Sequence, residues 1–152
     1  MERILFVSQL DQKLKLIRTE YGLTQEKMAD ILGISKKTLV EIEKGRRSLG
    51  WSGAVTLTAL FADSEILQNA YGGELSDLLT ALAFQHTNVT YPPTMGGKIW
   101  WKQLEEFGGY QIQQNIISQH YRLLTPQGHR IVSSFSREDL DPYVKQIQEN
   151  LE

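Results

Sequence analysis

Basic side chains gather on both sides of a short apolar-periodic segment near the start of the chain. Between Ser35 and Arg47 there are five of them, against the two acidic residues Glu41 and Glu43; the basic residues are Lys36, Lys37, Lys44, Arg46 and Arg47. A lysine can approach the O6 and N7 acceptors of guanine, and a carboxylate can accept from cytosine N4 while repelling phosphate. Long basic side chains beside a carboxylate therefore suit contacts to G·C-containing DNA. The alternative is a solvated, lysine-rich helix face.

The composition of the whole chain differs from that of this basic cluster. The 152 residues include 41% hydrophobic side chains and carry a formal net charge of -2. The net charge is +1 over residues 1–70 (ten basic, nine acidic) and -3 over residues 71–152 (six basic, nine acidic). No cysteine is present, which excludes a disulfide framework and fits a reducing compartment. We expect a cytoplasmic protein without a membrane anchor, with one medium core or two small ones.

Helical periodicity runs through the first half of the chain. Capping patterns and apolar spacing predict a first helix from Ser8 to about Tyr21 and a second from Thr24 through Leu32. Gly33 can take the positive φ of a tight turn, and Ser35 can then cap a third helix that ends at Gly45. Further helices are expected over residues 51–61, 64–71 and 74–84. The first half is therefore predicted to be all-helical.

A change in composition separates this half from the rest. Residues 85–98 contain two prolines, two glycines and almost no apolar periodicity, which is typical of a linker. Residues 99–107 fit a helical stripe, and a strand that ends in a glycine hairpin is nearly as plausible, so this element stays open. Strands are expected over 110–117, 121–125 and 130–135, before a capping box at Ser136 and Asp139 and a terminal amphipathic helix. We predict a helical domain at 1–84, a linker at 85–98 and a small α+β domain at 99–152.

The stretch from Arg18 to Arg47 resembles the XRE/Cro-like helix-turn-helix family of bacterial and phage transcriptional repressors. The resemblance rests on the order Arg18, Gly22-Leu23-Thr24-Gln25, Ala29, Gly33-Ile34-Ser35 and Ile42-Glu43-Lys44-Gly45-Arg46. With the flanking helices it covers roughly residues 8–71. It implies a lambda-repressor-like helical bundle for the N-terminal domain and says nothing about the rest of the chain.

The same resemblance implies a role for each matching residue. Gln25 is expected to hydrogen-bond a DNA phosphate from the first turn of the second helix. The helix from Ser35 to Lys44 is expected to enter the major groove. Its base-reading residues would be Lys36, Lys37 and Glu41, with Ser35 and Thr38 near the backbone or bases and with Lys44, Arg46 and Arg47 near phosphates. Arg18 and Glu43 match an ion pair with a structural role.

The sequence departs from the family after the third helix. Many members have a proline or a serine-rich turn there, whereas this chain has Leu49-Gly50-Trp51-Ser52-Gly53. We expect Trp51 to pack under the fold and not to contact DNA.

Two features of the second half have two interpretations each. Alternation along Tyr110 to Asn115 places Ile112 on one face and Gln111 and Gln113 on the other, which predicts a wet sheet surface or, alternatively, a polar ligand or partner site. The aromatic residues of this half are expected to close a small core, with an aromatic pocket as the alternative; they are Trp100, Trp101, Tyr110, Tyr121 and Phe135.

These features predict a sequence-specific regulator that binds double-stranded operator DNA, which we expect to be a dimeric repressor. A homodimer is expected because one reader of this size makes too few base contacts to specify an operator. Two alternatives stay open: an antitoxin-type protein that binds a toxin and regulates its own operon, and a regulator gated by a small-molecule or protein effector at the C-terminal domain. The sequence has no catalytic motif, no metal-ligand spacing and no cofactor motif, so we expect neither an enzyme nor a cofactor.

Overall fold

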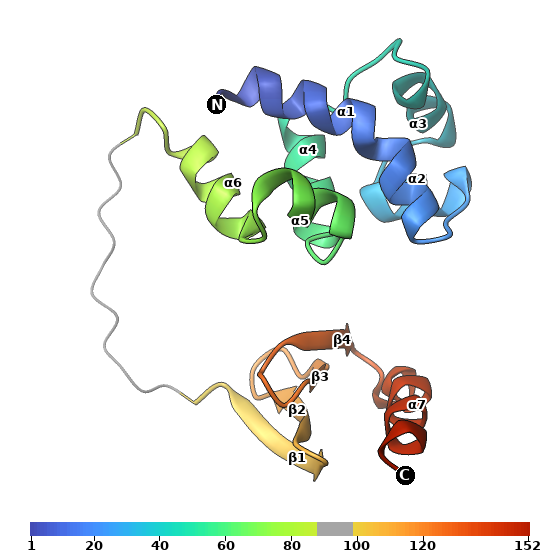
Figure 1. Cartoon of the computed structure of the whole chain (residues 1–152), viewed down its shortest axis with the longest axis vertical. Coiled ribbons are helices and arrows are strands. Elements are labelled where there is room, and N and C mark those ends of the chain that lie inside the picture. The colour runs from blue at the N-terminus through green and yellow to red at the C-terminus, as the bar shows by residue number, and fades with distance from the viewer. Residues whose placement is uncertain (88–98) are drawn as a thin grey trace. The chain divides into compact units, whose positions relative to one another are not determined.

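The computed structural model describes residues 1–87 and 99–152, which lie in two compact units (Figure 1). We call residues 1–87 the helical unit and residues 99–152 the sheet unit. Most of the predicted linker at 85–98 lies outside the described residues. None of the helices in the two described ranges has the length and apolar composition that crossing a membrane requires.

Six helices are described in the helical unit: α1 (Arg3–Glu20), α2 (Gln25–Leu32), α3 (Lys36–Glu43), α4 (Gly50–Leu60), α5 (Glu65–Tyr71) and α6 (Leu75–Ala83). The first helix begins at Arg3, so the predicted start at Ser8 is wrong. Its buried side chains explain the difference: they are Phe6, Leu10, Leu14 and Ile17. Because Phe6 extends the apolar stripe one turn further back, tertiary packing favours a longer helix than the capping pattern at Ser8 predicted.

The other helices lie within about two residues of their predicted bounds, a difference comparable to the uncertainty of any helix end. Trp51, at the start of α4, packs against the core as expected. Its ring meets that of Phe6 edge-on, with 6.3 Å between centroids, and the Arg3 guanidinium lies 4.4 Å from its ring centroid.

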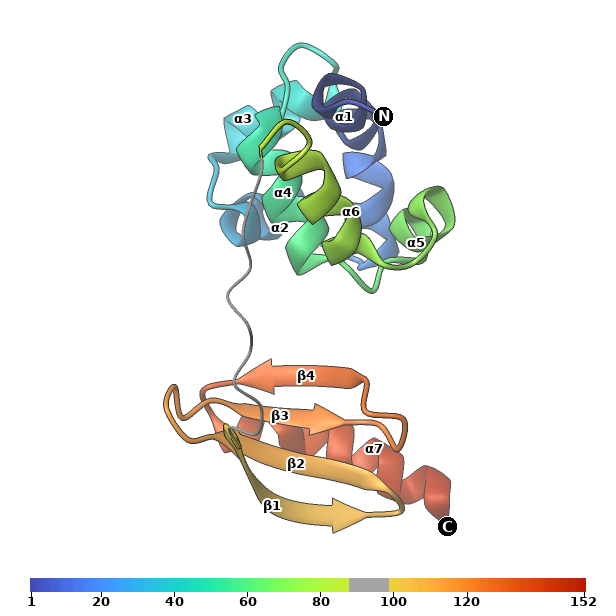
Figure 2. The ribbon, with the colours of Figure 1, turned by 90° about the vertical axis from the view of Figure 1, so that its left-hand side faces the viewer.

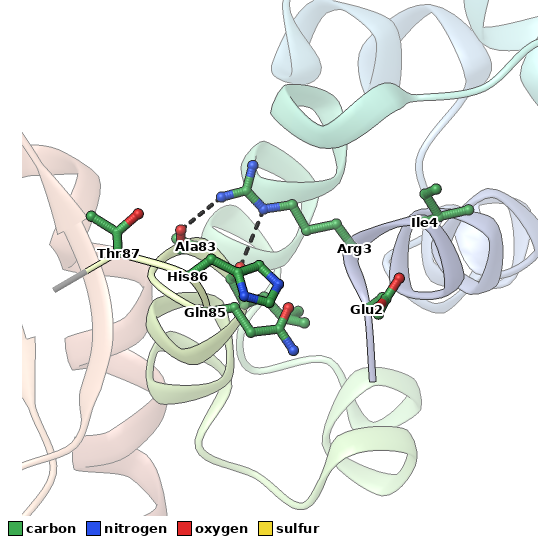
Figure 3. Close-up of a pocket in the computed structure, with 8 residues that line it drawn as sticks. Glu2, Arg3, Ile4, Ala83, Gln85, His86 and Thr87 are labelled. Carbon is green, nitrogen blue, oxygen red and sulfur yellow. Dashed lines mark hydrogen bonds between the residues drawn. The ribbon is translucent and has the colours of Figure 1, made fainter.

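Arg3 also connects the first helix to the last one. Its Nε and Nη2 donate to the carbonyl oxygens of Leu82 (3.2 Å) and Ala83 (2.7 Å) at the end of α6 (Figure 3). These carbonyls have no partner inside the helix, and a cation there also opposes the negative end of the helix dipole. A surface pocket of about 400 Å³ lies beside Arg3. The hydrogen bonds of Arg3 at the border of this pocket hold α1 and α6 together.

The sheet unit is a four-stranded antiparallel sheet in the order β1-β2-β3-β4, followed by a 3₁₀ turn and a helix. Its elements are β1 (Trp101–Phe107), β2 (Tyr110–Asn115), β3 (Tyr121–Leu124), β4 (Arg130–Ser134), η1 (Arg137–Leu140) and α7 (Asp141–Leu151). The segment that sequence left open is thus a strand, β1. The α7 helix covers one face of the sheet (Figure 2), where Ile112 and Leu123 form a small core with Leu140 and Val144.

The predicted capping box at Ser136 is wrong. The Ser136 side chain makes no capping hydrogen bond, and Asp139 instead accepts a hydrogen bond of 2.5 Å from the Ser134 hydroxyl. The chain then passes through η1 before α7 begins. The physical reason is Leu140, which is fully buried against the sheet and fixes the path of this turn.

Candidate nucleic-acid interface

A tight turn joins α2 to α3 and fixes how α3 is presented. The Thr24 hydroxyl caps α2 by accepting from the Lys27 N–H, and Ser35 caps α3 by accepting from the Thr38 N–H at 3.0 Å. Between the two helices Gly33 adopts φ +71°, a left-handed conformation that costs a residue with a Cβ about 1 kcal/mol or more. Each cap satisfies a backbone donor that the helix leaves without a partner. The sequence Gly-Ile-Ser therefore builds the turn locally.

One face of α3 anchors it in the helical core, and the opposite face is free. Leu39 and Ile42 are buried against the residues of α1, α2 and α4. Lys36 and Lys37 are exposed and make no ion pair with any described residue. A short helix with its apolar face anchored and its long basic side chains free is a rigid support for contacts to another molecule.

A nearly buried polar network holds the end of α3 against α1. Arg18 Nε donates to Glu43 Oε1 at 2.6 Å, and the two side chains are only 15% and 5% exposed. Arg18 Nη1 also donates to the Leu23 carbonyl at 3.0 Å. The resemblance implied this ion pair, and its geometry is that of a support for α3. Glu43 accepts a further hydrogen bond, from Gln25 Nε2 at 2.7 Å.

The network changes the acidity of Glu43. Desolvation alone would raise the pKa of this carboxyl. The hydrogen bonds from Arg18 and Gln25, together with the nearby charges of Arg18 and Lys15, outweigh it and lower the pKa below its ordinary value. Glu43 therefore stays ionised throughout the neutral range, and the ion pair persists there.

Gln25 lies where the family resemblance places it, at the first turn of α2, but it has an internal partner. Because one amide hydrogen points to Glu43, the side chain is held in a single orientation. An amide nitrogen carries two hydrogens, so one remains for a phosphate oxygen. The expected phosphate contact thus stays a prediction, now with a fixed donor.

Of the remaining predicted residues, Lys44 is exposed at the C-terminal end of α3, and the other five form two small groups. In the first, the Ser35 hydroxyl donates to Thr38 Oγ1 (2.9 Å), which also accepts a longer bond from Arg47 (3.4 Å). In the second, Arg46 lies 3.8 Å from Glu41, with both side chains partly or largely exposed. Ser35, Thr38 and Arg47 are thus brought together, as are Glu41 and Arg46.

The loop after α3 depends on a residue that sequence reasoning missed. Asp11, on α1, accepts a hydrogen bond of 2.8 Å from the Leu49 N–H through its carboxylate oxygen Oδ1. This contact pins the segment between the basic cluster and α4 at the point where the chain departs from the family. No local pattern could have indicated it, because the two residues are 38 positions apart.

A comparison with protein families identifies this part of the chain. A family model described as a helix-turn-helix domain matches residues 12–70. The helical unit contains a helix-turn-helix domain. The match spans α1 to α5 and includes every residue of the basic cluster. No curated protein and no solved structure matches the chain.

The helix-turn-helix domain and its charge pattern indicate a DNA-binding regulator. In this class the second helix of the pair lies in the major groove, and here that helix is α3. The local charge from Ser35 to Arg47 is +3, from five basic and two acidic residues, although the whole chain is acidic. Glu43 is paired inside the fold, so the exposed excess of positive charge is larger still.

Proposed function

We propose that the chain is a sequence-specific transcriptional regulator of the XRE/Cro type that binds operator DNA as a dimer and acts as a repressor. The observation that carries the proposal is the position of Lys36 and Lys37. They stand exposed and without ionic partners in the first turn of α3, the part of a recognition helix that contacts base edges. Bidentate or paired contacts of this kind are worth about 1–3 kcal/mol each.

The other polar residues of the domain divide into specifying and positioning roles in this proposal. Glu41 accepts from cytosine N4, and its carboxylate is repelled by the O6 and N7 acceptors of guanine and the O4 acceptor of thymine. Gln25, Lys44, Arg46 and Arg47 contact phosphates, which position the protein without reading sequence. If about four phosphates are neutralised per protomer, log affinity falls with log salt with a slope of about -3.6 per protomer.

Dimerisation follows from the small number of base contacts that one α3 can make. A two-fold dimer reads two half-sites about one helical turn apart, so its operator is palindromic or nearly so. Two half-sites together give the discrimination that a regulator needs among the competing sites of a genome.

Selection of bound duplexes from a random pool tests this proposal. The expected result is a palindromic sequence with G·C pairs in each half-site and spacing of about one helical turn. The double variant Lys36→Ala/Lys37→Ala should lose this preference, while the matched control Lys102→Ala/Lys145→Ala removes the same charge from the sheet unit and should keep it. A pool without any enriched sequence would contradict the proposal.

A further inference from the structure

One face of the sheet in the sheet unit is open. Successive residues of a strand point to opposite faces, so Gln113 and Arg122 face away from Ile112 and Leu123, which pack under α7. Figure 2 shows α7 behind the four strands and no other described element of this unit in front of them. By register, Trp101 and Ser133 share the open face with Gln113 and Arg122.

A positive charge is held in place on this face without being neutralised. Arg122 lies over the Trp101 ring, 3.6 Å from the centroid, and its Nε and Nη2 donate to Gln113 Oε1 at 2.9 and 2.7 Å. Gln113 in turn donates to Gln103 and Gln111, each at 3.2 Å. Arg122 has no carboxylate within ion-pairing distance among the described residues. Its guanidinium is therefore oriented but still able to bind an external anion.

A row of rings lies beside this cation at one end of the open face. Trp101 meets His120 edge-on, with 5.0 Å between ring centroids, and His120 lies 5.8 Å from Phe135. Phe135 is 78% exposed, which is unusual for a phenylalanine that had only to close a core. A shallow hollow of about 280 Å³, lined by His120, Ser133, Ser134 and Phe135, opens at this row.

The acidic residues of the unit gather mainly on its other side. Five of them lie on or beside η1 and α7, behind the sheet: Glu138, Asp139, Asp141, Glu149 and Glu152. Glu105 is paired with Arg137 at 3.0 Å, and Glu106 is placed by register opposite Gln111, close to the β1–β2 turn and away from the ring row. An anion approaching the aromatic end therefore meets Arg122 before it meets a carboxylate.

We propose that the open face of the sheet unit binds single-stranded nucleic acid. Unpaired bases stack on Phe135 and His120, a backbone phosphate lies at Arg122, and the side-chain amides of Gln103 and Gln111 hydrogen-bond base edges. An exposed aromatic row beside an oriented arginine is the combination that single-strand binders use. A duplex does not offer free base faces to such a row, and a hollow this shallow does not enclose a metabolite.

The test uses the full chain and fluorescence anisotropy with labelled oligonucleotides of roughly ten nucleotides, within the usual site size. Oligo-dT and oligo-U are measured separately to distinguish DNA from RNA. Phe135→Ser and Arg122→Gln should each weaken binding by about tenfold, which is typical for loss of one stacked base or one phosphate contact. The matched controls Tyr143→Ser and Lys145→Gln, on the helix side of the unit, should leave binding unchanged.

The duplex-binding residues of the helical unit separate this inference from the proposed function. Lys36→Ala/Lys37→Ala should keep single-strand binding, and Phe135→Ser should keep operator binding. Because Phe135 is so exposed, its loss should leave the fold intact, which circular dichroism checks. Absence of binding to both oligonucleotides would overturn the inference. So would equal losses in the controls, or a change of oligomeric state in Phe135→Ser without any single-strand binding, which would make the face a contact between copies.

Discussion

The two units use an arginine and a glutamine in opposite ways. In the helical unit, Arg18 and Gln25 both bind the carboxylate of Glu43, so the charge of the arginine is neutralised inside the fold. In the sheet unit, Arg122 binds only the amide oxygen of Gln113 and the face of Trp101. In the helical unit, the charge of Arg18 is neutralised by Glu43, and the ion pair holds α3 in place. In the sheet unit, the charge of Arg122 is not neutralised and stays available to an external anion. The same two residue types therefore indicate a structural role in the helical unit and a binding role in the sheet unit.

Removal of each arginine should give the largest difference in stability between the two units. Arg18→Ala leaves Glu43 charged and nearly buried, and we expect it to lower the free energy of unfolding of the helical unit by about 3 kcal/mol. Arg122→Ala leaves only neutral partners behind and should cost the sheet unit less than about 1 kcal/mol. Hydrogen exchange in graded urea, measured peptide by peptide, reports the two units separately. Equal losses in both variants would show that the arginines do not differ in role.

Acid should destabilise the helical unit through protonation of Glu43, and this is the next largest effect. The pKa of Glu43 is lowered in the folded state, so its contribution to stability is complete above the ordinary pKa of glutamate, about 4.3. That contribution is lost as the pH falls below this value and through the lowered pKa of the folded state. In urea titrations between neutral pH and about pH 3, the helical unit of Glu43→Gln should lose less stability than the wild type. If stability fell in parallel with pH in the two proteins, Glu43 would not be the source of the acid sensitivity.

The cap of α3 gives a smaller effect. Ser35→Ala removes the acceptor for the Thr38 N–H and should destabilise the helical unit by about 1 kcal/mol. Ser35→Asp restores an acceptor next to the positive end of the helix dipole and should recover most of this loss. Thermal unfolding of the three proteins measures the difference. If the alanine variant were as stable as the wild type, the Ser35 cap would not contribute to the stability of α3.

The outermost ion pair should give the smallest change in stability. Arg46 and Glu41 are 3.8 Å apart, with side chains 68% and 32% exposed, so Arg46→Ala should change the free energy of unfolding by less than about 0.5 kcal/mol. The same variant should reduce the salt slope of operator binding by about one, because one phosphate contact is lost. An unchanged slope would show that Arg46 does not contact a phosphate.

The helix-turn-helix could be predicted from the sequence because its determinants are local. Thr24 and Ser35 cap helices three residues away, and Gly33 adopts its turn by its own conformational freedom. The start of α1 was predicted wrongly because the packing of Phe6 in the core outweighed the local capping pattern at Ser8. The Asp11–Leu49 contact could not be predicted, since nothing near either residue requires it.

In the sheet unit, alternation alone predicted correctly that Ile112 would be buried with Gln111 and Gln113 on the opposite face. It could not place Arg122 beside Gln113, because this neighbourhood depends on the register between β2 and β3. For the same reason the aromatic residues divide in a way the sequence did not reveal. Tyr110 and Tyr121 pack against the core, whereas Phe135 is exposed at the end of β4.

Competition binding is the most direct measure of base recognition by the two leading lysines of α3. The affinity of the selected operator is compared with that of a duplex whose G·C pairs are replaced, for the wild type and for Lys36→Ala/Lys37→Ala at one salt concentration. We predict that the wild type prefers the operator by at least about 30-fold for each half-site, from two contacts of at least 1 kcal/mol each. In the double variant we predict that most of this preference is lost, with only the contribution of Glu41 left, while its folding is unchanged. A variant that still distinguishes the two duplexes as the wild type does would contradict the claim.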